Sequence, residues 1–124
     1  MSDYIKQNSE GNAVLVFGDS NSRYTRAVDV ATIFRTENGM TDAWVELIRS
    51  GEEPAPGSEA IVCENPSTTT ACEIVDKVWY RGSSDVTLRA TEFQYAGNMF
   101  LQEDGNILSD HNPVLVDFSW SLSN

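Results

Sequence analysis

The sequence has few basic residues, with eight Lys and Arg against nineteen Asp and Glu and a formal net charge of −11. A field of this sign repels polyanions, so the charge does not support nonspecific binding to nucleic acid in the absence of cations. An acidic surface is also a common means of staying soluble. The charge therefore disfavours one substrate class without identifying another.

Long apolar runs are also missing. No stretch approaches the roughly twenty apolar residues that span a bilayer, and the polar segment 1–12 does not resemble a signal peptide. We interpret this segment as a polar leader. The chain has only two cysteines, Cys63 and Cys72, at the two ends of a short polar loop. A local disulfide and a pair of reduced core thiols are both compatible with that count.

The remaining composition is that of a globular domain, since 40% of the 124 residues are hydrophobic. One domain over 13–124 is expected. Apolar spacing predicts helices over 24–34 and from Thr41 or Asp42 through Ile48, and a long loop over 50–70. Strands are predicted over 13–17, 74–80, 86–95 and 113–120, with a turn at 104–106. This order indicates an α/β (α+β) fold.

Asp19 and Asn21 follow directly on the first predicted strand, where ligand-binding groups are often placed. A carboxylate can hold a hard cation or accept a proton from water, and an amide can donate to a phosphoryl oxygen. A Gly-rich turn with two self-bonding polar residues would have the same sequence.

His111, the chain's single histidine, lies in a polar cluster before the last predicted strand. An imidazole beside a carboxylate is suited to general acid catalysis, although an exposed histidine in a turn is equally compatible with the pattern. Asp76 is a charge within an otherwise apolar run. Its partner is either His111 or a nearby cation such as Lys77 or Arg81.

Four segments, taken in order, resemble the C-terminal motifs of the endonuclease/exonuclease/phosphatase superfamily, which includes deoxyribonuclease I-like nucleases and neutral sphingomyelinases. The segments are Leu15-Val16-Phe17-Gly18-Asp19-Ser20-Asn21-Ser22-Arg23, Thr41-Asp42-Ala43-Trp44, Val75-Asp76-Lys77-Val78 and Leu108-Ser109-Asp110-His111-Asn112-Pro113-Val114. The resemblance extends from residue 13 to residue 120. It implies the C-terminal half of a four-layer α/β/β/α sandwich, with a mixed β-sheet and covering helices.

The resemblance also implies residue roles for phosphoester hydrolysis. Asp19 matches the aspartate that orients the attacking water near a metal, and Asn21 matches the asparagine that contacts the phosphate. Asp76 matches the carboxylate that pairs with the terminal histidine. Asp110 matches an acidic residue close to a metal in some members, and His111 matches the histidine that steadies the phosphate or donates a proton.

The chain departs from the family pattern because the early asparagine, the metal-binding glutamate and a second histidine have no counterpart in it. We therefore expect a phosphoesterase fragment, inactive alone, whose Mg²⁺ (or Mn²⁺ or Ca²⁺) needs ligands from a missing N-terminal half. That half, or self-association, would cover an open apolar sheet face. The alternative is a catalytically silent binding module that retains the fold.

Substrate and location are less defined. Nucleic acid, sphingolipid and inositol phosphate all remain candidate substrates, with no evident membrane-insertion hairpin in the sequence to favour a lipid. A disulfide between Cys63 and Cys72, and secretion of the full-length form, are implied by the resemblance to secreted relatives.

Overall fold

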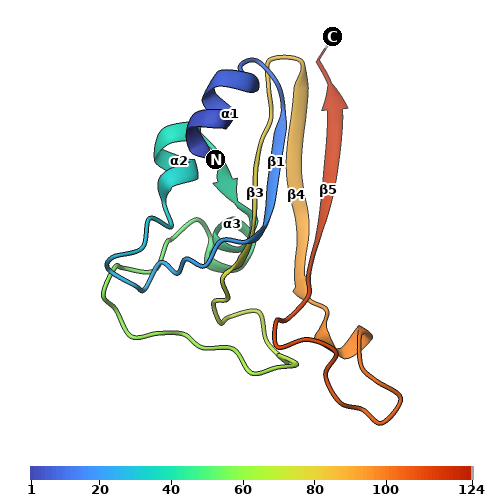
Figure 1. Ribbon diagram of the computed structural model, residues 1–124. Helices are drawn as coiled ribbons and strands as arrows, with labels where there is room; N and C mark the ends of the chain where they lie inside the picture. Colours follow the sequence, from blue (N-terminus) through green and yellow to red (C-terminus); the bar gives the residue numbers. More distant parts are fainter. Residues whose placement is uncertain (124) are drawn as a thin grey trace.

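The computed structural model describes residues 1–123 and has an α+β fold of short helices and antiparallel strands (Figure 1), which confirms the predicted fold class. No helix within residues 1–123 is long and apolar enough to cross a membrane. In chain order, the elements are α1 Ser2–Asn8, β1 Val14–Asp19, α2 Ile33–Asn38, β2 Thr41–Asp42, α3 Ala43–Arg49, β3 Asp76–Arg81, β4 Val86–Tyr95, the 3₁₀ helix η1 Gly97–Met99 and β5 Val114–Leu122.

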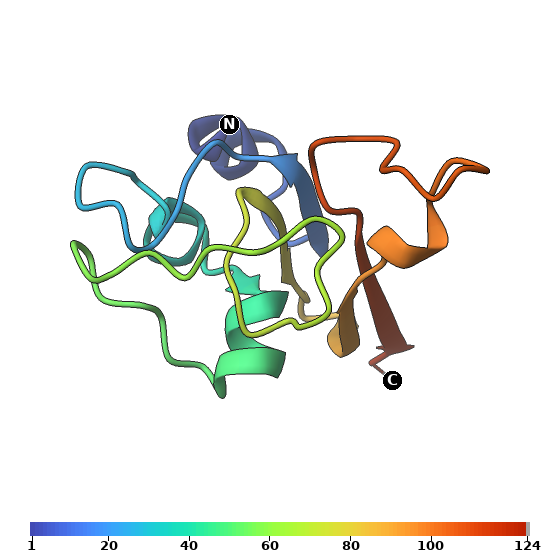
Figure 2. The same ribbon diagram turned by 90° about the horizontal axis from the view of Figure 1, so that it is seen from below.

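Where one mixed sheet was expected, the named strands form two antiparallel sheets. One has the strand order β1-β3-β2 and the other consists of β4 and β5. The sheets meet where Tyr80 of β3 and Phe118 of β5 pack edge to face, with ring centroids 5.2 Å apart. The α-helices lie on the side of β1 and β3 away from β5, whereas η1 lies on the side of β5 (Figure 2). The place of this unit in a four-layer sandwich stays a prediction.

An aromatic cluster forms the core between the helices and β3. Trp79 of β3 lies 6.3 Å from the Tyr24 ring and 5.8 Å from the Phe34 ring, centroid to centroid. Tyr24 also stacks on Trp44 of α3 at 6.4 Å. Because aromatic pairs contribute stability beyond their buried area, this cluster holds β3 firmly against the helices. The start of β3, where Asp76 lies, is thereby fixed.

The predicted start of α3 is confirmed. The side chain of Asp42 accepts a hydrogen bond from the Trp44 backbone N–H at 2.9 Å, which satisfies one of the free donors of the first turn. The helix ends at Arg49, one residue beyond the predicted Ile48, and Ser50 takes a left-handed conformation.

The prediction of a helix over 24–34 is wrong, because turns occupy most of this segment and α2 begins only at Ile33. Val28 and Val30 are 91% and 65% exposed, so their helical spacing does not mark a buried face. Side chains instead bind the backbone here. The Tyr24 N–H donates to Glu73 Oε2 at 2.9 Å, and the Arg23 N–H donates to Asp29 Oδ2 at 2.9 Å.

The polar leader contains a helix that the sequence did not predict. α1 buries Ile5 against the core, and Arg81 of β3 donates to the backbone oxygen of Ser9 at 2.9 Å just after the helix. One buried isoleucine in a polar segment gives too weak a periodic signal to predict a helix.

Large apolar side chains are exposed on the strands, as an open sheet face would require. Leu15 and Phe17 of β1 are 46% and 77% exposed, and Trp120 and Leu122 of β5 are 68% and 66% exposed. Leu115 of β5 is 38% exposed as well. Isolated apolar residues are common on protein surfaces, but five large ones on two strands are typical of a surface that another chain or segment covers.

Candidate functional site

Two aspartates face each other where β1 ends and β3 begins. Asp19 is the last residue of β1, Asp76 is the first of β3, and the two are register partners in the antiparallel ladder. Ser20 extends the pairing, because its N–H and its hydroxyl both donate to the Val75 oxygen, at 3.0 and 2.7 Å. Since directly opposed residues share one face of a sheet, two negative charges are brought close together.

Asn21 lies in the turn that follows β1. Its φ of +48° is in the left-handed region, which asparagine tolerates better than most residues. The Asn21 N–H donates to Asp19 Oδ1 at 2.8 Å, which fixes the orientation of that carboxylate. This is the self-bonded arrangement of polar residues that the sequence also allows here, and the roles of Asp19 and Asn21 in catalysis stay predictions.

His111 reaches the two aspartates from the loop before β5. Its Nδ1 forms a hydrogen bond of 2.7 Å with Asp76 Oδ2, and its Nε2 lies 4.0 Å from Asp19 Oδ2. The His111 side chain is 41% exposed, so the ring is accessible to a ligand. Of the partners considered for Asp76, the structure therefore selects His111.

The surrounding carboxylates raise the pKa of His111 above its usual value. The hydrogen bond to Asp76 is the main cause, and the charges of Asp76, Asp110 and Asp19 act in the same direction. The imidazolium form is thereby favoured. Because the His111 ring lies between Asp19 and Asp76, its positive charge also offsets the repulsion between these two carboxylates.

The pKa of His111 can be measured by NMR on metal-free protein, and we expect it above the ordinary value of about 6.5. Asp76→Asn should lower the pKa of His111, whereas Asp117→Asn on β5 should not.

The raised pKa also makes stability depend on pH. Because the pKa of His111 is higher in the folded than in the unfolded protein, protonation stabilises the fold below the unfolded pKa. That contribution is lost as the pH rises through the folded pKa. A His111 pKa at or below 6.5 in the wild-type protein would contradict this reading of the site.

Asp110 shares a polar cavity of about 300 Å³ with the other site residues. It is exposed, next to His111 in sequence. The cavity is lined by Asp19, Asn21, Arg23, Arg26, Cys63, Asn65, Ile74, Val75, Asp76, Asp110, His111 and Asn112. All five residues predicted for catalysis, phosphate contact or metal binding therefore border one space.

These residues do not by themselves make a complete metal centre. Within residues 1–123, no group of three or more His, Cys, Asp or Glu side chains is placed to hold a metal ion. Mg²⁺ requires near-octahedral oxygen coordination, part of which water can supply. Asp19 and Asp110 are suitable oxygen donors, but they do not fit a full site without further ligands.

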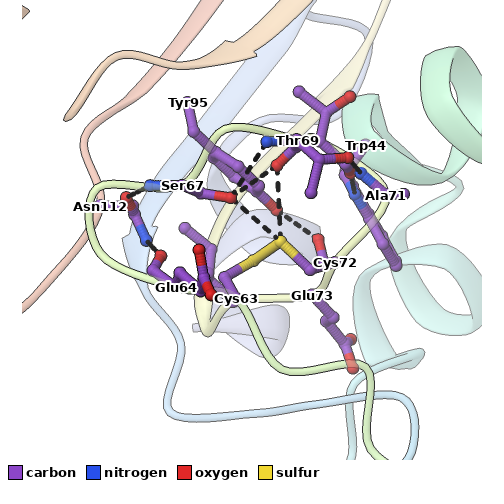
Figure 3. The surroundings of a disulfide bond; sticks show 12 residues. Trp44, Cys63, Glu64, Ser67, Thr69, Ala71, Cys72, Glu73, Tyr95 and Asn112 are labelled. Carbon is purple, nitrogen blue, oxygen red and sulfur yellow. Dashed lines mark hydrogen bonds between the residues drawn. A yellow bond between two sulfur atoms is a disulfide. The ribbon is translucent and has the colours of Figure 1, made fainter. Parts of the chain in front are cut away.

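Cys63 and Cys72 form a disulfide bond (Figure 3). Of the two alternatives left open by the cysteine count, the bond is the one present. It closes a loop next to the polar cavity and ends four residues before Asp76. A cross-link here restrains the chain leading into β3, at a position where the sequence predicts no regular structure.

Sequence reasoning missed an apolar loop beside His111. This loop, residues 97–108, includes η1 and the bridge between Leu101 and Ile107, and it turns at Gly105. Its exposed apolar residues are Met99, Phe100, Ile107 and Leu108, which are 39–68% exposed. Phe100, Ile107 and Leu108 border a cavity of about 260 Å³ that also touches His111. Adjacent Met99 and Phe100, ahead of the correctly predicted turn at 104–106, were the available signal.

Comparison with known proteins finds relatives of one kind. The chain is 36% identical over all of its 124 residues to proteins named sphingomyelinase from Mycobacterium bovis and from two strains of Mycobacterium tuberculosis. The chain spans 24% of the length of these relatives. No protein-family model matches the chain, and no solved structure matches it.

Proposed function

We propose that this chain carries part of the active site of a sphingomyelinase-like phosphodiesterase of the endonuclease/exonuclease/phosphatase superfamily. The observation that carries the proposal is the position of His111 between two aspartates. Its Nδ1 lies 2.7 Å from Asp76 Oδ2 and its Nε2 lies 4.0 Å from Asp19 Oδ2. The named relatives support a phosphodiester substrate. The order of the four sequence motifs supports the superfamily.

In the proposed reaction, water attacks phosphorus and the bond from phosphorus to the leaving-group oxygen breaks. Asp19 orients the water and accepts its proton, and its own orientation comes from the Asn21 N–H. The Asn21 side chain donates to a phosphoryl oxygen. The His111 imidazolium, oriented by Asp76, stabilises the phosphoryl charge or donates a proton to the leaving oxygen.

We further propose that the active form binds Mg²⁺, Mn²⁺ or Ca²⁺, with Asp19 and Asp110 among the ligands and the remaining ligands from outside these 124 residues. Such an ion would neutralise charge on the phosphate and polarise the phosphoryl group. The 124-residue chain alone is then inactive. The exposed apolar residues of β1 and β5 are covered either by another part of the protein or by a second copy.

A lipid substrate is favoured over a nucleic acid by the surface beside the site. The apolar loop presents Met99, Phe100 and Leu108 next to His111, where they can enter the interfacial region of a membrane. The net charge of −11 works against a polyanionic substrate. A disulfide is typical of proteins in oxidising compartments, which supports a secreted protein.

The direct test is release of phosphocholine from sphingomyelin vesicles by the full-length protein, first in EDTA and then with added Mg²⁺. We expect release only with the metal. A protein that binds the vesicles and releases no phosphocholine under either condition would support the silent binding module instead.

Phe100→Ser should weaken binding of the full-length protein to sphingomyelin vesicles by about tenfold. Burying a phenylalanine side chain contributes about 1.5–3 kcal/mol, and 1.4 kcal/mol corresponds to tenfold. Vesicle sedimentation measures the affinity. Val28→Ser is the matched control, because Val28 is 91% exposed and borders neither of the two cavities next to His111, so its loss should leave binding unchanged. Equal loss in both variants would argue against a role for the apolar loop.

A further inference from the structure

Asn112 is a buried residue next to the half-buried His111. The residue is 6% exposed, and its side chain makes two hydrogen bonds to backbone groups far away in sequence. Oδ1 accepts from the Ser67 N–H at 2.9 Å, and Nδ2 donates to the Glu64 oxygen at 2.8 Å (Figure 3). The amide therefore uses a donor and an acceptor to hold one short piece of chain, residues 64–67.

The same piece of chain also binds the residues before His111. Asn65 Nδ2 donates to the backbone oxygen of Ser109 at 2.8 Å. Residues 64–67 thus contact the loop that carries His111 at two positions, Ser109 before the histidine and Asn112 after it. Three hydrogen bonds across this contact leave the His111 backbone little freedom to move relative to residues 64–67.

Residues 64–67 lie inside the loop closed by the disulfide. The Ser67 hydroxyl contacts Cys72 Sγ at 3.4 Å, and the Tyr95 hydroxyl of β4 donates to the Cys72 oxygen at 2.7 Å. Cys72 is buried and lies four residues before Asp76. Both members of the Asp76–His111 pair are consequently attached to this one loop, Asp76 through the chain and His111 through Asn112.

Close packing on the other side of Asn112 further restricts the loop. Gly97 has no room for a side chain, because a Cβ atom would lie 2.8 Å from Pro66 Cβ and 3.2 Å from Asn112 Oδ1. The Ala96 N–H donates to the Pro113 oxygen at 2.8 Å and ties the end of β4 to the start of β5. Asn112 therefore sits in a rigid junction between three loops.

We propose that Asn112 is a positioning residue, which couples the disulfide-closed loop to His111 and so holds the imidazole against Asp76. The proposal rests on the role that the proposed function gives to His111. Asn112 borders the polar cavity, but both ends of its side-chain amide are engaged by residues 64–67, and no step of the proposed reaction uses it. Its effect is geometric, and a displacement of about 1 Å in an active site can lower the rate on the order of 10²-fold.

The test uses the NMR signal of the His111 Nδ1 proton, which is held in the hydrogen bond to Asp76. The chain has a single histidine, so the assignment is unambiguous. In Asn112→Ala this signal should be lost. The matched control is Asn38→Ala, because Asn38 is 5% exposed and its amide also donates to a distant backbone oxygen, that of Ser2, away from the site. Asn38→Ala should keep the signal even where it lowers the melting temperature.

Asn65→Ala covers the case in which Asn112→Ala fails to fold, because Asn65 is not buried and contributes a single bond. In Asn65→Ala we expect the signal of the His111 Nδ1 proton to be broadened or shifted. An unchanged signal in a folded Asn112→Ala protein overturns the proposal, as does an unchanged signal in Asn65→Ala when Asn112→Ala is unfolded.

Kinetics separate this proposal from the proposed function. In the full-length protein, Asn112→Ala should lower kcat for sphingomyelin at least about tenfold with KM changed less than about twofold. If the wild-type protein shows no hydrolysis, the proposed function fails, and the NMR comparison still decides whether Asn112 positions His111.

Discussion

Replacing His111 with alanine should lower kcat for sphingomyelin hydrolysis by the full-length protein by about 10²- to 10⁴-fold, the usual contribution of a positioned acid or base. The variant lacks the imidazole that Asp76 orients through a bond of 2.7 Å. It also removes the imidazolium that lies between Asp19 and Asp76. Steady-state release of phosphocholine measures the effect.

Asp76→Asn should also lower kcat, because the amide of asparagine can orient the His111 ring but does not stabilise the positive charge of the imidazolium. Asp117→Asn is a matched control, since Asp117 is an exposed aspartate on β5 that borders neither of the two cavities next to His111. Its activity should remain within about twofold of the wild type. A His111→Ala enzyme with unchanged kcat would remove the histidine from the mechanism.

Lys77→Met should lower the free energy of unfolding by about 3–5 kcal/mol, because it leaves a buried carboxylate without its counter-ion. Lys77 Nζ lies 3.1 Å from Glu73 Oε2, and the two side chains are 4% and 0% exposed. The ammonium also lies 4.8 Å from the centre of the Tyr24 ring. Urea denaturation of the 124-residue chain measures the loss.

Two further variants identify the cause of that loss. Adding Glu73→Gln to Lys77→Met should restore at least ~2 kcal/mol, because the buried charge is removed and an acceptor for the Tyr24 N–H is kept. Lys6→Met breaks an exposed ion pair with Glu37 and should cost less than about 1 kcal/mol. If Lys77→Met lowers the free energy of unfolding no more than Lys6→Met does, the buried pair of Lys77 and Glu73 is not important for stability.

Of the five strands within residues 1–123, four were predictable because each carries a local pattern that the fold does not override, whereas the two-residue strand β2 was not predicted. The predicted strand over 86–95 matches β4 Val86–Tyr95, and β3 Asp76–Arg81 overlaps the predicted 74–80 closely. Apolar and aromatic residues with bounding turns are sufficient for such elements. The Asp42 cap was readable for a similar reason, since its bond to Trp44 involves neighbours in sequence.

Features that depend on distant contacts were not predictable. The segment 24–34 has helical spacing, but its backbone is bound by Glu73, which is 49 residues beyond Tyr24. Asn112 likewise gains its role from Ser67 and Glu64, and no local pattern identifies these partners. The resemblance supplied the site residues, whereas the contacts that position them required the fold.

The most direct test of the proposed function is hydrolysis of sphingomyelin by the full-length protein in water enriched in ¹⁸O, with mass spectrometry of the products. Attack of water at phosphorus predicts one ¹⁸O atom in each phosphocholine released and none in the lipid product, with release strongly reduced in His111→Ala. Phosphocholine without label, or no release by the wild-type protein with metal present, would contradict the account.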